Sequence, residues 1–89
     1  MPLTKEEKAK IIKQFAQAKG DTGSPEIQVA LLSAEIEKLQ VHLKEHPHDA
    51  PAKRALLSKV AKRRRLLRYL ADRNSDRYQA LIKALKLRK

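Results

Sequence analysis

Apolar side chains between residues 25 and 45 recur with a helical period, and this pattern constrains the fold more than any other feature of the chain. Steps of three and four residues place these side chains on one face of a helix. No window of the sequence alternates with a period of two for long, as a half-buried strand would. The segment therefore predicts a helix from about Pro25 to Glu45 with a core-facing stripe of Val29, Leu32, Ile36, Leu39 and Leu43.

Capping signals predict three further helices. Thr4 and Glu7 have the spacing of a capping box, in which hydroxyl and carboxylate accept hydrogen bonds from each other's backbone amides. Asp49 can cap a helix that follows the polar segment around Pro47, and Asn74 or Ser75 can cap the last one. The expected helices cover about residues 5–18, 25–45, 50–72 and 76–86.

These helices predict an all-α fold in a single domain, residues 1–89, because 89 residues suit one small domain. Short connections make neighbouring helices antiparallel, so three of the four are expected to pack as an antiparallel bundle. The N-terminal helix has only a narrow apolar stripe of Ile11, Ile12, Phe15 and Ala18. It is marginal on its own, which makes it a candidate for weak docking or for movement.

Positive charge is concentrated in one interval. The chain has 21 Lys and Arg against 10 Asp and Glu, a net charge of +11. The interval between Asp49 and Asp72 contains no acidic residue and carries +8 of that charge. At 100° per residue, Val60 and Leu67 lie on one side of the predicted helix. The opposite side contains Arg54, Ser58, Lys62, Arg65, Arg68 and Tyr69.

Such a face favours a polyanionic partner. Eight positive charges without a negative one repel one another, so a purely solvated face is the less favoured interpretation. The planar guanidinium of arginine suits bidentate contacts to phosphate. A membrane-surface helix usually has large aromatic or apolar residues on its other face, whereas here that face has the spacing of a packed core. Nucleic acid is therefore the expected partner, and an architectural DNA-binding protein stays open beside an RNA-binding one.

Several function classes find no support in the sequence. The chain has no cysteine, which excludes disulfides, thiolate catalysis and Cys-ligated zinc. It has neither an apolar run of about 18 residues nor the pattern of a secretory signal, so a cytoplasmic protein without membrane contact is expected. Its His, Ser and Asp residues form no recognisable catalytic motif, and a small helical bundle has little room for a pocket. We expect no enzyme activity, cofactor, bound metal or small-molecule substrate.

The turn over residues 19–24 allows two interpretations. Gly20 suits the position just past a helix end and Ser24 suits a helix N-cap, so the turn can be plain capping chemistry. The same groups can also bind a ligand, because a helix N-terminus with the hydroxyls of Thr22 and Ser24 suits an anion or a ribose 2′-hydroxyl. Gln28 lies one turn further along the predicted helix, and its side-chain amide can add a hydrogen bond to the same ligand.

A second polar group lies between the two long helices. His42 and His46 have the i, i+4 spacing of metal ligands, but a closed site would need further ligands. The group can instead be a polar corner in which Asp49 caps the next helix. A third interpretation is recognition of an RNA minor groove, where imidazole and carboxylate can meet a guanine amino group and 2′-hydroxyls.

Four segments along nearly the whole chain carry a family resemblance. They are DTGSPEIQVALL (21–32), the spacing of His42, His46 and Asp49, KRRRLLRYL (62–70) and RYQALIKALKLR (77–88). Together they resemble the family of bacterial ribosomal small-subunit protein fifteen. The resemblance implies a four-helix protein that binds the central domain of small-subunit ribosomal RNA and supports subunit assembly. It implies neighbouring small-subunit proteins as partners, with large-subunit RNA at an intersubunit bridge as a further candidate.

The resemblance also implies two RNA contacts. One is a minor groove contacted by His42 and Asp49, with Arg64 near a phosphate. The other is a three-way helical junction, carried over by position to Thr22, Gly23, Ser24, Gln28, Arg65 and Tyr69. The set of candidate RNA-binding residues also includes His46 from the polar group between the two long helices. From the basic face it includes Arg54, Ser58 and Arg68.

The chain departs from the family pattern directly after Asp49. Relatives usually continue D-H-H-S-x-R-G-L-L, whereas this chain reads DAPAKRALL. Ala50 and Pro51 stand in place of two histidines, Ala52 in place of a serine that hydrogen-bonds RNA in the family, and Ala55 in place of glycine. The minor-groove contact is therefore expected to lose a hydroxyl.

Overall fold

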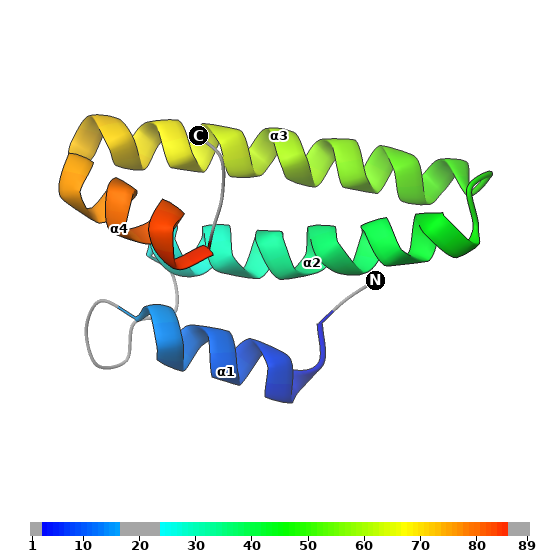
Figure 1. The fold of residues 1–89 in the computed structure, drawn as a ribbon, viewed down its shortest axis with the longest axis horizontal. Helices are drawn as coiled ribbons and strands as arrows, with labels where there is room; N and C mark the ends of the chain where they lie inside the picture. Colours follow the sequence, from blue (N-terminus) through cyan, green and yellow to red (C-terminus); the bar gives the residue numbers. More distant parts are fainter. Residues whose placement is uncertain (1–2, 17–23, 86–89) are drawn as a thin grey trace.

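The described residues form four α-helices and no strand, which confirms the predicted all-α class (Figure 1). The computed structural model describes residues 3–16 and 24–85. Antiparallel α2 and α3 are the two long elements, α4 folds back from the end of α3, and α1 lies along the other side of α2. The bounds are α1 Lys5–Phe15, α2 Pro25–Glu45, α3 Ala50–Arg73 and α4 Ser75–Leu85.

The predicted caps account for where the helices begin. Thr4 and Glu7 form the full capping box, with N···O distances of 3.0 and 3.1 Å. Ser24 Oγ accepts from the Ile27 amide at 3.4 Å, as an N-cap does. Asn74 both ends α3 and caps α4, because its Oδ1 accepts from the Arg77 amide at 3.2 Å.

The N-terminal helix is shorter than the sequence pattern predicts. It ends at Phe15, because Ala16 has an extended backbone, with φ −61° and ψ 134°, while its amide still donates to the Ile12 carbonyl. The helix therefore stops before Ala18, which lies outside the described residues. The third helix ends one residue later than predicted, at Arg73, and the fourth begins one residue earlier, at Ser75, within the fraying that helix termini show. The predicted end of the fourth helix, residue 86, lies outside the described residues.

The core joins side chains from all four helices. Val29 of α2 packs with Leu67 and Leu70 of α3 and Leu81 of α4, and Phe15 of α1 packs against this cluster. The stripe continues along α2 through buried Leu32, Ile36 and Leu39, as its period predicts. The core thus aligns the start of α2 with the end of α3, and the end of α2 with the start of α3.

One ion pair and few apolar contacts dock α1 on α2. No residue within α1 is fully buried, although Leu3 just before it is 6% exposed, which the sequence pattern did not indicate. Lys38 Nζ donates to Glu7 Oε1 at 2.6 Å. That hydrogen bond, with the one from the Thr4 amide, lowers the pKa of Glu7 from 4.5 to about 2. Glu7 therefore stabilises the docked fold above pH 4.5, and this contribution is lost as the pH falls through about 2.

Candidate nucleic-acid interface

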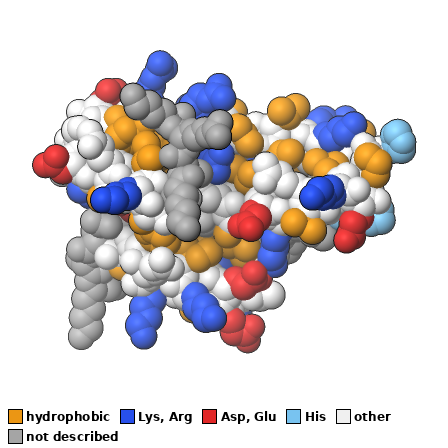
Figure 2. All heavy atoms as spheres, viewed as in Figure 1, with side chains coloured by type: hydrophobic (Ala, Val, Ile, Leu, Met, Phe, Trp, Pro, Cys, Tyr) orange, Lys and Arg blue, Asp and Glu red, His pale blue; other side chains and the backbone are white. Residues whose placement is uncertain are grey.

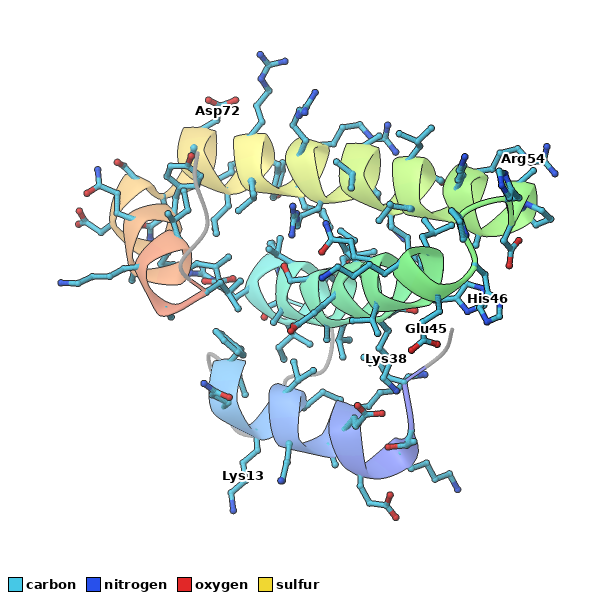
Figure 3. The ribbon with its side chains drawn as sticks, turned by 45° about the vertical axis from the view of Figure 1, so that its right-hand side comes forward. Lys13, Lys38, Glu45, His46, Arg54 and Asp72 are labelled. Carbon is cyan, nitrogen blue, oxygen red and sulfur yellow. The ribbon has the colours of Figure 1, made fainter. Side chains whose placement is uncertain are left out.

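The outer side of α3 presents the basic face that the helical period predicts. Figure 3 shows nitrogen-tipped side chains extending from the side of α3 that faces away from α2, with Arg54 near one end and Asp72 near the other. Lys53 and Lys62, also from the acid-free interval, are exposed. The candidate RNA-binding residues on this helix are also exposed. They are Arg54, Ser58, Arg64, Arg65, Arg68 and Tyr69. This side of the helix is available to phosphates.

Two of the eight basic residues do not belong to that face. Lys59 Nζ donates to Glu35 of α2 at 3.3 Å, and Arg63 Nη1 donates to the Ser33 hydroxyl at 3.3 Å. Burial lowers the pKa of Arg63, but an arginine stays protonated at neutral pH. These two cations therefore tie α3 to α2, and the surface charge of the face is smaller than the sequence count of +8.

Tyr69 is the aromatic member of this face, and it has a neighbour that the sequence analysis missed. Its side chain is 49% exposed. The Arg73 guanidinium carbon lies 5.1 Å from the centre of the Tyr69 ring, which is cation–π distance. The i, i+4 spacing of the two residues could have indicated this pair. Arg73 therefore extends the basic face to the last turn of α3.

The start of α2 lies at the same end of the molecule as Tyr69. Thr22 and Gly23 lie outside the described residues. Ser24 caps the helix, so its hydroxyl has the structural role that the capping interpretation assigns to it. Gln28 is half-buried one turn further on, next to Val29, which packs against Leu67 and Leu70. The core thus places Ser24 and Gln28 at the same end of the α2–α3 pair as Tyr69.

The opposite end carries the histidine corner, made up of His42, His46, His48 and Asp49. Figure 2 shows its histidine side chains where α2 ends and α3 begins. His42 Nε2 lies 2.7 Å from Asp49 Oδ2, so the two side chains meet across the turn. Asp49 Oδ1 accepts from the Ala52 amide at 3.1 Å and caps α3. The His46 ring lies against His42 with centroids 4.8 Å apart.

The corner combines a structural cap with an exposed polar surface. Hydrogen bonds from His42 and from the Ala52 amide lower the pKa of Asp49 below its ordinary 3.8, so the carboxylate is ionised at neutral pH. His46 and His48 are exposed and line an open hollow of about 480 Å³ beside the turn. Within the described part of the chain, no three His, Cys, Asp or Glu residues are grouped to hold a metal ion. The hydrogen bonds that the structure shows at the corner join His42 to Asp49 and Asp49 to the Ala52 amide.

The two candidate RNA contacts lie far apart, at opposite ends of α3. Asp49 and Tyr69 are separated by twenty residues of α3, or about 30 Å at 1.5 Å per residue. The exposed cations of α3 lie between them. A ligand that uses both ends must be long and polyanionic, which a nucleic acid is. No helix in the described residues is both long enough and apolar enough to span a bilayer.

Known proteins resemble this chain over its whole length. The family described as ribosomal protein S15 matches residues 8–88. The small ribosomal subunit protein uS15 of Colwellia psychrerythraea is 55% identical over 89 residues, 100% of both chains. The uS15 protein of Acholeplasma laidlawii is 51% identical over the same span, and that of Bordetella avium is 57% identical over 82 residues, 92% of each chain. The chain belongs to the ribosomal protein S15 family.

Proposed function

We propose that this protein is a structural constituent of the small ribosomal subunit that binds the central domain of its RNA. As an S15 family member it is a structural, non-enzymatic ribosomal protein. In the proposal, it works bound to ribosomes in the cytoplasm, holds the arms of a three-way RNA junction and so supports assembly with neighbouring proteins. A contact to large-subunit RNA at an intersubunit bridge belongs to the same proposal.

The exposed basic side of α3 is the observation that carries the proposal. Its arginines supply affinity through phosphates, which position an RNA without specifying its sequence. Specificity for a junction requires groups at fixed places, and in the proposal the start of α2 and Tyr69 supply these from the same end of the helix pair. The histidine corner at the other end supplies the second contact, in a minor groove.

Replacing Arg65 by alanine is expected to weaken RNA binding and to flatten its salt dependence. Arg65 is exposed near the middle of the basic face. Each lost phosphate contact removes about 0.7–0.9 from the slope of log K against log salt concentration. The measurement is a salt titration with a junction RNA from the central domain. Lys83→Ala, which removes an exposed cation from α4, should leave affinity and slope near wild type.

Comparing nucleic acids at fixed salt separates the proposal from an architectural DNA-binding role. The wild-type protein is expected to prefer the junction RNA over duplex RNA and duplex DNA of equal length. Equal affinity for all three would mean that only the charge of α3 is recognised. An unaltered slope in Arg65→Ala would place that side chain in solvent, away from any phosphate.

Removing residues 1–18 is expected to leave RNA affinity within about tenfold of wild type, or ~1.4 kcal/mol. The deleted segment contains none of the candidate contact residues, and its lysines are partly balanced by Glu6 and Glu7. The deletion does remove Phe15 from the core cluster, so stability should fall. Circular dichroism checks that the remaining helices are folded. A larger loss of affinity in a folded protein would make α1 part of the interface.

A further inference from the structure

A buried carboxylate at the start of α2 has no place in the RNA contacts proposed above. Glu26 is 3% exposed, and no other charged side chain among the described residues is fully buried. It lies in the first turn of α2, where the helix dipole favours a negative charge. Its partner is Arg77 in the first turn of α4, 51 residues away, which binds both carboxylate oxygens through Nε and Nη2.

Arg77 is itself held at two points. Its backbone amide donates to Asn74, the residue that ends α3 and caps α4. Its guanidinium donates to Glu26, with Nη2 at 2.6 Å from Oε1. A bidentate guanidinium–carboxylate pair fixes orientation as well as distance. Arg77 thereby joins the end of α3 and the start of α2 to the start of α4, through its backbone amide on one side and its guanidinium on the other.

From this arrangement we infer that Glu26 and Arg77 are positioning residues for RNA binding, which hold the start of α2 in register with the end of α3. The inference rests on the proposed function. The groups positioned are Ser24 and Gln28 on α2, and Tyr69 with its neighbour Arg73 on α3. Neither Glu26 nor Arg77 is required to touch RNA.

Stability alone does not account for a charge pair at this position. Taking a carboxylate out of water carries a large desolvation penalty, which its partner must offset, and apolar residues of similar size are often at least as stabilising. The core cluster already packs Val29 against Leu67, Leu70 and Leu81 here. The hydrophobic effect is non-directional, whereas a bidentate ion pair fixes the relative orientation of its two side chains, so the pair adds a defined geometry to a packed end.

The test compares two Glu→Gln variants on the same helix. Glu26→Gln removes the charge from the buried pair, and Glu35→Gln does the same for the Lys59 pair, which also joins α2 to α3. Both raise the net charge by one, so nonspecific attraction to RNA changes equally. Affinity for the junction RNA and for duplex RNA is measured well below the melting temperature of each variant.

Glu26→Gln is expected to lower affinity for the junction RNA by about 2- to 30-fold, the range for residues that act without touching a ligand. Duplex affinity should match that of Glu35→Gln, and the salt slope should equal that of wild type because no phosphate contact is lost. A purely structural pair would lower the melting temperature and leave the affinity of the folded variant unchanged. That result, or an equal loss in Glu35→Gln, overturns the inference.

Arg77→Lys provides the second variant if Glu26→Gln does not fold. It keeps the charge and removes the bidentate geometry. Junction affinity should fall with the salt slope unchanged, and wild-type junction affinity in folded Arg77→Lys overturns the inference. Failure of the proposed function looks different, because the wild-type protein itself would then bind junction and duplex RNA equally.

Discussion

Replacing Leu70 by alanine is expected to lower the free energy of unfolding by about 2–5 kcal/mol. Leu70 is 2% exposed and packs in the cluster that joins α2, α3 and α4. Its removal leaves a cavity at the end of the bundle, where three helices meet. For a domain of this size the loss is a large share of total stability. Urea unfolding followed by circular dichroism measures it.

Leu57→Ala is the matched control for this prediction. Leu57 lies on the same helix but is 69% exposed. Its replacement should change the free energy of unfolding by less than about 0.5 kcal/mol, as is usual for surface positions. Equal losses at the two positions would contradict the assignment of the core, and so would a loss below 1 kcal/mol in Leu70→Ala.

Replacing His42 by alanine is expected to cost about 1–3 kcal/mol of RNA affinity, because its RNA partner groups would be left unpaired. The loss should be largest on RNAs that keep the cognate base pairs of the minor-groove contact. A double-mutant cycle between His42 and those base pairs measures the coupling. A coupling energy near zero would mean that the corner does not bind the minor groove. The same conclusion would follow if His42→Ala lost no more RNA affinity than His48→Ala.

The stability of the free protein offers an independent check on the His42–Asp49 pair. The hydrogen bond from His42 is the largest cause of the lowered pKa of Asp49. A carboxyl group whose pKa is lowered by folding stabilises the fold above its ordinary value of 3.8, and this contribution is lost as the pH falls through the folded pKa. Between pH 6 and pH 2, His42→Ala should therefore lose less stability than wild type. His48→Ala should follow wild type, because the pair at Asp49 is intact.

The helices and their caps could be predicted because they depend on residues close in sequence. The Thr4–Glu7 capping box and the Asp49 cap each join residues three apart, so a short window contains all the necessary information. The exposure of Arg54, Arg65 and Arg68 follows from one helical period. The contact between His42 and Asp49 is also local, since only a short turn separates them.

Contacts between distant segments escaped prediction for the opposite reason. Lys59 and Arg63 belong to the basic interval, but the rotation of α3 against α2 turns them toward Glu35 and Ser33. A helical period gives relative angles around one axis, and it does not say which polar side chains at the edge of the stripe will meet a partner helix. The burial of Leu3 likewise depends on how α1 docks.

Fold class, the capping residues, the basic side of α3 and, through resemblance to relatives, the family were all predictable from the sequence. These properties depend on local periodicity, caps and charge, which any short segment carries with it. The burial of Glu26 against Arg77, 51 residues away, and the pairing of two of the eight cations with α2 are seen only in the packed molecule. Such pairings depend on the packing angle between helices, which is set by the whole core at once.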